Sequence, residues 1–187
     1  MRREGLGRSV SKEWRVKGRK PVRHKRLKGL IKRLTEVLGV DPEVEQAFLE
    51  TARFGTWTLL IVDKKTLAVE VPRPDDLAGE GRPAGEVLAF ATLRGVIEWD
   101  VSVRWCAVDA GAIPFLMNGA DCMGAGIHLA DPAVQRGDLV WIRDQKHGKP
   151  LALGWALLSG DEMVETVKGK AVRTIHWVGD ELWNIGL

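Results

Sequence analysis

The clearest alternation of hydrophobic and polar positions lies between residues 24 and 38. Apolar side chains recur there every three or four residues, which is the spacing of one face of an α-helix. The members of this face are Leu27, Leu30, Ile31, Leu34, Val37 and Leu38. Gly39 follows the last of them, where a left-handed helix cap is common. The pattern therefore predicts an amphipathic helix over His24–Leu38.

A second, shorter helix is predicted directly after the first. Asp41 stands where an N-cap belongs, and Pro42 occupies the first helical position, which proline favours. Val44, Ala47 and Phe48 would form its buried side. The acidic residues of its first turn would suit the positive end of the helix dipole. The sequence thus predicts two consecutive helices ahead of the first strands.

The next segments have the composition of strands and turns. Residues 56–63 and 66–71 predict two strands that form a hairpin around Lys64-Lys65. Prolines end the second strand, and residues 75–85 are rich in glycine, proline and charged side chains, which predicts an exposed loop. A further strand is expected near residues 86–91.

The second half of the chain has several short apolar runs separated by glycine turns. Strands are predicted at residues 139–142 and 151–158, and a short helix at 161–167. Residues 174–178 and 181–185 would pair as strands across Gly179-Asp180. Many short strands with glycine turns are typical of a small barrel.

Residues 108–127, VDAGAIPFLMNGADCMGAGI, combine a helix signal with a glycine-rich turn. Asp109 stands where an N-cap belongs, and Pro114 removes an amide donor, so the helix should be short or bent. Gly119 would cap its end, and Gly124 and Gly126 would bring bare backbone near a surface. Spacing alone leaves open whether this is a structural turn or a ligand surface.

These residues resemble a known family. VDAGAI, NGADCM and GAGI resemble the start of a PUA domain, the RNA-binding barrel named after pseudouridine synthases and archaeosine transglycosylases. QRGDLVWI, KGKAV and IHWVGDELW resemble its later segments, so the resemblance covers residues 101–183. Ala125 departs from it, since the family often has proline there.

The whole chain resembles the malignant T-cell-amplified-sequence family and its archaeal relatives. The resemblance implies an α+β protein with a basic tail and an α/β pre-PUA domain at residues 1–97. A PUA pseudo-barrel follows at 98–187. Such proteins act without catalysis or cofactor, in the cytoplasm, on the small ribosomal subunit or tRNA in translation initiation, reinitiation or recycling. A density-regulated-type protein is an expected partner.

The same resemblance places RNA along the short helix, the glycine turn and a later lysine–glycine segment. Glycines let a phosphate or a terminal ribose approach backbone amides, and lysines supply charge. The matching residues are Asn118, Gly119, Ala120, Asp121, Met123 and Gly126, with Lys168, Gly169 and Lys170.

Charge is distributed unevenly along the chain. Residues 1–33 contain 14 Lys or Arg and 2 Glu, whereas residues 34–101 contain 6 basic and 13 acidic side chains, and residues 102–187 contain 8 and 10. A basic end on an otherwise acidic chain indicates a polyanion partner. The predicted phosphate-facing residues are Lys25, Lys28, Lys32 and Arg33. A merely solvated helix face or tail remains the alternative.

The sequence lacks the usual signs of catalysis or membrane insertion. It has no phosphate-binding GxxxxGK[ST] loop, its four histidines are scattered, and no apolar run approaches the roughly 20 residues that span a bilayer. Cys106 and Cys122 form no CxxC pair and are expected to be buried thiols.

Two alternative functions stay open: an accessory protein that presents tRNA or rRNA to a separate modifying enzyme, and a module that binds only proteins. The eight tryptophans would fill the core, with one or two left for base stacking.

Overall fold

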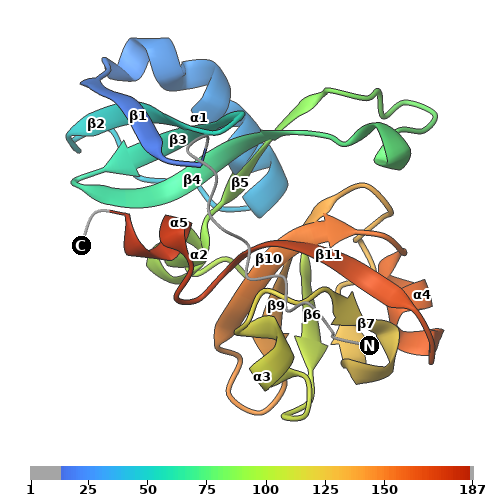
Figure 1. The fold of residues 1–187 in the computed structure, drawn as a ribbon. Coiled ribbons are helices and arrows are strands. Elements are labelled where there is room, and N and C mark those ends of the chain that lie inside the picture. Colours follow the sequence, from blue (N-terminus) through green and yellow to red (C-terminus); the bar gives the residue numbers. More distant parts are fainter. Residues whose placement is uncertain (1–13, 186–187) are drawn as a thin grey trace, which may run out of the picture.

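The computed structural model describes residues 14–185, so the predicted basic tail at residues 1–13 lies outside the described residues. Two β-sheets lie one above the other, and the short helices α2 (Leu93–Glu98) and α5 (Glu181–Asn184) lie between them (Figure 1). This mixture of helices and sheets confirms the predicted α+β class.

The first sheet is an antiparallel meander whose five strands lie side by side in sequence order. Its strands are β1 (Val16–Pro21), β2 (Leu49–Phe54), β3 (Trp57–Val62), β4 (Lys65–Pro72) and β5 (Val87–Ala91). The predicted hairpin forms between β3 and β4, but its turn is Asp63-Lys64. Both residues have positive φ, 47° and 72°, as a two-residue hairpin of type I′ requires. The loop after β4 contains a short 3-10 helix, η1 (Asp75–Leu77).

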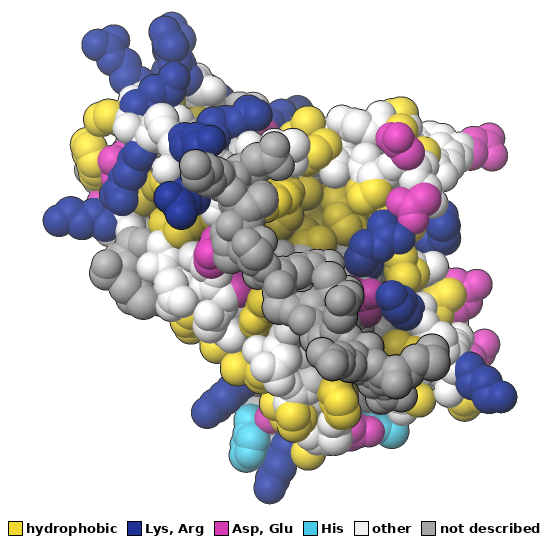
Figure 2. Space-filling view, viewed as in Figure 1, with side chains coloured by type: hydrophobic (Ala, Val, Ile, Leu, Met, Phe, Trp, Pro, Cys, Tyr) yellow, Lys and Arg dark blue, Asp and Glu magenta, His cyan; other side chains and the backbone are white. Residues whose placement is uncertain are grey.

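The helix α1 (His24–Leu38) has the predicted bounds and joins β1 to the loop before β2. Leu27, Leu30, Leu34 and Leu38 are buried in the core of the first sheet. Gly39 has φ 67°, and its N–H donates to the Thr35 carbonyl oxygen. Figure 2 shows Lys and Arg side chains crowded at the upper left of the molecule, over β1 and α1.

The predicted second helix after Gly39 is wrong. Residues 41–48 form a loop with a single turn, in which the Ala47 N–H donates to the Val44 carbonyl oxygen. Val44 is buried, but the Phe48 side chain is 55% exposed. The chain leaves this loop into β2, a central strand that sequence reasoning missed. Few residues separate Pro42 from β2, and pairing with both β1 and β3 outweighs the weak local preference for a helix.

The second sheet curls into a half-barrel with strand order β7-β11-β10-β9-β6-β8. β6 and β9 are parallel, and all other neighbours are antiparallel. The strands are β6 (Trp105–Val108), β7 (Cys122–Met123), β8 (Ile127–Ala130), β9 (Leu139–Asp144), β10 (Pro150–Ala156) and β11 (Lys170–Trp177). The associated helices are α3 (Ile113–Leu116), η2 (Gly124–Gly126) and α4 (Gly160–Glu165). Among residues 14–185, no helix has the length and apolar character needed to cross a membrane.

The predicted last strand is wrong, because residues 181–184 form the short helix α5 (Glu181–Asn184). Asp180 is its N-cap, and its carboxylate accepts the Trp183 N–H at 2.7 Å. The same carboxylate bonds the buried His176 ring at 2.8 Å. An aspartate after a glycine turn favours the start of a helix. The cap therefore explains why residues 181–184 form a helix, although their apolar alternation also fits a strand.

The joint between the two sheets has an apolar part. One hydrophobic core contains side chains from both halves, including Phe90 and Leu93 from the first and Trp141 and Trp155 from the second. The helix α2 (Leu93–Glu98) lies at this joint. The predicted domain boundary between residues 97 and 98 falls at the end of α2 and stays a prediction.

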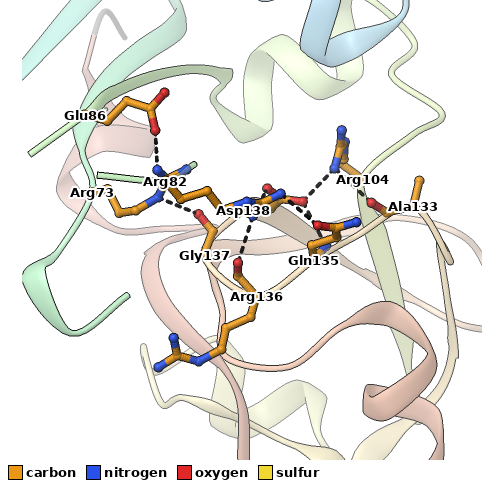
Figure 3. A network of polar contacts seen from close by, with 9 residues as sticks. All are labelled: Arg73, Arg82, Glu86, Arg104, Ala133, Gln135, Arg136, Gly137 and Asp138. Atoms are coloured by element: carbon orange, nitrogen blue, oxygen red, sulfur yellow. Dashed lines mark hydrogen bonds and ion pairs between the residues drawn. The ribbon is translucent and has the colours of Figure 1, made fainter. Parts of the chain in front are cut away.

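A polar network beside this core also joins the two halves (Figure 3). Asp138, just before β9, bonds Arg82 of the loop after β4 at 2.7 Å and Arg104 at 2.6 Å. Arg73, at the end of β4, is buried and donates to the Gly137 carbonyl oxygen at 3.2 Å. Charge-assisted hydrogen bonds of this kind are roughly twice as strong as neutral ones. The loop predicted to be merely exposed therefore ties the first half to the second.

Candidate nucleic-acid interface

The short helix α3 begins with a turn that Asp109 stabilises. One carboxylate oxygen of Asp109 accepts the Ala112 N–H at 3.2 Å, and the other bonds the His128 ring at 2.9 Å. Asp109 was predicted to be the N-cap, but the N-cap residue is Ala112, and Asp109 instead closes the turn before it. The hydrogen bond from His128 is the main reason that the pKa of Asp109 lies below its ordinary value. Pro114 lies in the first two positions of a four-residue helix, which confirms the prediction of a short one.

Gly119 ends α3 in the predicted left-handed conformation, with φ 77°. Its N–H donates to the Leu116 carbonyl oxygen, and the next N–H, of Ala120, reaches back to Phe115. A Cβ at this position would also lie 2.7–2.9 Å from the indole of Trp177. Glycine is therefore needed here both for its backbone angle and for the closeness of α3 to β11.

Gly124 and Gly126 bring backbone close to other parts of the protein itself. A Cβ on Gly124 would lie 2.7 Å from the Thr166 carbonyl oxygen, and its N–H donates to the Gly169 carbonyl oxygen at 3.0 Å. A Cβ on Gly126 would approach the Ala112 side chain at 3.2 Å. These glycines fasten the turn to the segment before β11 and to the start of α3. They thereby shape the surface between these elements.

A hollow of about 270 Å³ lies between α3 and the glycine turn. Among its lining residues are Asp109, Phe115, Asp121, Met123 and Gly126. Phe115 is 67% exposed and Met123 is 47% exposed, so two apolar side chains stand at its rim in water. Three of the predicted RNA-binding residues thus meet at one concave surface, and Asn118, Gly119 and Ala120 flank it at the end of α3.

Three of the predicted site residues around the hollow have internal partners. Asp121 accepts the Thr174 N–H at 3.0 Å and forms an ion pair with Lys170 at 2.8 Å. Asn118 donates from its side-chain amide to the Pro114 carbonyl oxygen at 2.8 Å. Asp121 therefore holds β11 in place, and its pairing with Lys170 sets the direction of that side chain.

The lysine–glycine segment lies beside the hollow. Lys170 pairs in register with Met123 of β7, so the beginning of β11 borders the glycine turn. Lys168, Gly169 and Lys170 are all exposed. Phe115 and His128 are the residues at this site that sequence reasoning missed. Phe115 is apolar, so from the sequence it is expected to be a core residue. His128 lies 19 residues from Asp109, which it contacts, so no local pattern indicated that contact.

The predicted basic face of α1 is exposed, but part of its charge is neutralised. Arg33 forms an ion pair with Glu70, and Lys32 lies 3.8 Å from Glu36. In the part of the chain that the structure describes, Lys25 and Lys28 take part in no ion pair. The cationic character of α1 therefore rests mainly on these two lysines and on Arg26, which is also exposed and outside these ion pairs.

The edge strand β1 adds basic side chains that the sequence analysis did not place on a strand. All six of its residues are exposed, and Lys17, Arg19 and Lys20 are among them. Arg19 contacts both carboxylate oxygens of Glu50, at 3.0 and 2.6 Å, and this hydrogen bonding lowers the pKa of Glu50. The basic surface, defined here as α1 and β1, lies on the upper half of the molecule, whereas α3 lies on the lower half (Figure 1).

The remaining candidate chemistry is buried. Cys106 and Cys122 are buried free thiols, as predicted, and a hydrogen bond to Cys122 together with burial raises the pKa of Cys106 well above its ordinary value. Within residues 14–185, no group of three or more His, Cys, Asp or Glu side chains could hold a metal ion. All eight tryptophans lie in the described part of the chain, and each is buried or half-buried. Base stacking on an exposed tryptophan thus has no candidate.

Comparison with known proteins shows to which family the chain belongs. The PUA domain model matches residues 105–178. An uncharacterized protein of Methanocaldococcus jannaschii is 36% identical over 136 residues, which cover 73% of this chain and 75% of that protein. The translation machinery-associated protein 20 of Saccharomyces cerevisiae is 30% identical over 116 residues, covering 55% of this chain and 64% of its own length. The match thus spans less than two thirds of the yeast protein.

Two further comparisons agree with this placement. The malignant T-cell-amplified sequence 1 homolog of Drosophila melanogaster is 32% identical over 95 residues, covering 49% of this chain and 52% of that protein. The crystal structure of a hypothetical protein from Pyrococcus horikoshii superposes with a TM-score of 0.69 and 29% identity over 91% of this chain and 100% of that one. The chain belongs to the malignant T-cell-amplified-sequence-like family of proteins, with a C-terminal PUA domain.

Proposed function

We propose that this protein binds structured RNA and acts, without catalysis, on the small ribosomal subunit or tRNA in translation initiation, reinitiation or recycling. Its PUA domain and the names of its relatives in yeast and fruit fly support an RNA-binding role related to translation. A density-regulated-type protein would be its partner. The observation that carries the proposal is the hollow between α3 and the glycine turn, with its exposed aromatic rim.

The hollow has the properties of a surface that reads RNA shape. Phe115 offers a flat apolar face on which an unstacked base can lie. Lys168 and Lys170 lie at its border. Since Lys170 already pairs with Asp121, Lys168 would be the main contact for a phosphate. Close packing at Gly119 and Gly124 fixes the backbone of α3 and of the glycine turn, so binding would not have to order this backbone.

The basic surface on β1 and α1 would hold the RNA backbone. Lysine and arginine side chains on exposed elements neutralise phosphates without reading sequence. Lys25 and Lys28 supply this charge on α1, and Lys17 and Lys20 supply it on β1. RNA would therefore contact the molecule at two places, one selected by shape and the other by charge.

The proposal of binding without catalysis is supported by the state of the reactive groups. The raised pKa of Cys106 keeps that thiol protonated, and a protonated thiol is a poor nucleophile. The Asp109–His128 pair lies at the hollow, but the Asp109 carboxylate is already used to close the turn before α3.

A variant at the rim of the hollow tests the proposal. Phe115→Ala should weaken binding to purified small ribosomal subunits or to tRNA by roughly 5- to 100-fold, because alanine substitution of a base-stacking aromatic costs about 1–3 kcal/mol. Fluorescence anisotropy with labelled RNA measures this affinity. Phe115→Trp should retain binding.

The matched control is Val164→Ala, which removes another exposed apolar side chain, on α4. It should leave the affinity unchanged. Wild-type protein that binds neither small subunits nor tRNA would contradict the proposed function itself.

A further inference from the structure

Among residues 14–185, only two Phe or Trp side chains are exposed. All twelve Phe and Trp residues lie in the described part of the chain, and ten of them are buried or half-buried. The exceptions are Phe115, at the hollow in the PUA domain, and Phe48, 55% exposed, in the first half. Phe48 also stands at a hollow, of about 480 Å³, where β1 passes into α1. Each exposed ring is therefore beside a concave surface.

The hollow beside Phe48 has an apolar floor and a firm frame. Val22, Ala47 and Leu49 supply apolar lining. The Phe48 N–H donates to the Asp63 carboxylate at 2.9 Å, and its carbonyl oxygen accepts the Asp63 N–H at 2.9 Å. The exposed ring thus projects from a backbone that is fixed on both sides.

The hollow itself has mixed charge, with Glu45 in its lining and Asp63 bonded to the Phe48 N–H, and it is the neighbouring basic surface that favours a polyanion. Arg23 and His24 line it, and the neighbouring elements β1 and α1 form the basic surface. Glu45 is the acidic member of its lining. A carboxylate repels phosphate but accepts a hydrogen bond from a base amino group. This arrangement suits a nucleotide whose base faces Phe48 and Glu45 while its phosphate lies on the side of Arg23.

We infer that the Phe48 hollow is a second RNA site, which takes an unpaired nucleobase from a single-stranded segment. The base stacks on Phe48, and the flanking phosphates lie along Arg23 and the basic surface. The volume falls within the range of about 300–1,000 Å³ typical of ligand pockets. Aromatic rings set among basic groups are the usual platform for single-stranded nucleic acid, because every base has a π-face. This inference rests on the proposed RNA-binding function and adds a site in the first half of the chain.

The test uses the full chain and two RNAs, a hairpin with a single-stranded extension of about 12 nucleotides and the same hairpin without it. Wild-type protein should bind the extended hairpin more tightly. Phe48→Ala should weaken binding of the extended hairpin by roughly 5- to 100-fold, the usual loss for a stacking aromatic, and leave the blunt hairpin nearly unchanged. Because no charge is removed, the dependence of affinity on salt should keep its slope.

Two further variants separate stacking from simple apolar contact. Phe48→Trp keeps an aromatic plane and should retain affinity for the extended hairpin. Phe48→Leu keeps the apolar character without the ring and should lose it, as Phe48→Ala does. With 2-aminopurine in the single-stranded segment, the fluorescence quenching caused by stacking should appear with wild type and disappear with Phe48→Leu. Since Phe48 is exposed, all three variants should keep the wild-type melting temperature.

The outcomes distinguish the inference from the function on which it rests. If wild type binds neither hairpin, small subunits nor tRNA, the proposed function fails, and the inference fails with it. If wild type binds RNA but Phe48→Ala binds the extended hairpin equally well, the inference alone is overturned, and Phe48 serves another contact, such as a protein partner.

Discussion

The hollow at α3 and the basic surface on α1 and β1 differ in what forms them: closely packed backbone at the first, and extended charged side chains at the second. At the hollow, three glycines bring backbone against neighbouring atoms, and Asp121 is held by a backbone N–H and a lysine. On the basic surface, long side chains extend from regular elements, and the backbone has no special conformation apart from Gly18 and Gly39. The first region depends on shape and the second on charge. Substitutions should therefore affect stability in the first region and salt dependence in the second.

The largest expected effect is at the shape-dependent region. Gly119→Val forces a β-branched side chain into a left-handed conformation and against Trp177, so we expect a loss of about 3 kcal/mol or more in the free energy of unfolding. Denaturant titration measures this loss.

Gly169→Val is the matched control, because Gly169 also has positive φ but has no atom within 4 Å of an added Cβ. It should cost only the backbone strain, on the order of 1–2 kcal/mol. Equal losses in the two variants would show that Trp177 moves aside, and that close packing of α3 on β11 is not what defines the site.

An intermediate effect is expected on the charge-dependent region. Replacing Lys25, Lys28 and Lys32 with glutamine should weaken all RNAs together and lower the slope of log affinity against log salt by about 2, at roughly 0.7–0.9 per phosphate contact. Adding Arg33→Gln should change the slope little further, because Glu70 already pairs with that arginine. Binding titrations at several salt concentrations measure the slope.

Lys146→Gln with Lys149→Gln provides the comparison for this prediction, since both lysines are exposed in the turn between β9 and β10. Their removal should leave the slope at its wild-type value. If the triple variant on α1 retains the wild-type slope, these lysines do not contact RNA phosphates and are ordinary solvated charges.

The smallest effect concerns pH and the turn before α3. The hydrogen bond from His128 lowers the pKa of Asp109 in the folded protein, so this carboxylate stabilises the fold above its unfolded pKa, near 4, and that contribution is lost as pH falls through the lower folded value. Both side chains are nearly half exposed and are screened by solvent, which limits the effect to under about 1 kcal/mol. Asp109→Asn should therefore lose slightly less stability than wild type between pH 5 and pH 3. Parallel acid titrations that coincide would contradict the role of this pair.

Local signals in the sequence were sufficient for the elements that depend on neighbouring residues. The apolar spacing of α1, its cap at Gly39 and the left-handed Gly119 involve contacts within a few residues, and the structure confirms all three. β2 was missed because its strand character comes from pairing with β1 and β3, which the local pattern does not contain. The predicted strand after Gly179 was wrong because a single cap, Asp180, outweighed the apolar pattern.

The position of the glycine turn was predictable from the sequence, whereas the contacts around it were not, and its role as a binding site stays a prediction. The glycine spacing and the family resemblance indicated the turn around residues 118–126. They did not show that Asp121 pairs with Lys170, or that Arg33 pairs with Glu70, because these partners lie on separate elements. The exposure of Phe48 and Phe115 was equally hidden, since an apolar residue in a sequence is normally assigned to the core.

The carboxylate of Asp138, held between Arg82 and Arg104, bears on how one RNA could use both surfaces. If a flexible linker joined the two surfaces, they would sample many separations. Binding of an RNA at one surface would then raise its effective concentration at the other only weakly. A fixed joint would give the full gain in affinity only to RNAs whose two contact points have the matching spacing. Other RNAs would bind at one surface at a time. Under the proposed function, the joint would thus select RNAs by the distance between their two contact points, even if neither surface reads a base sequence.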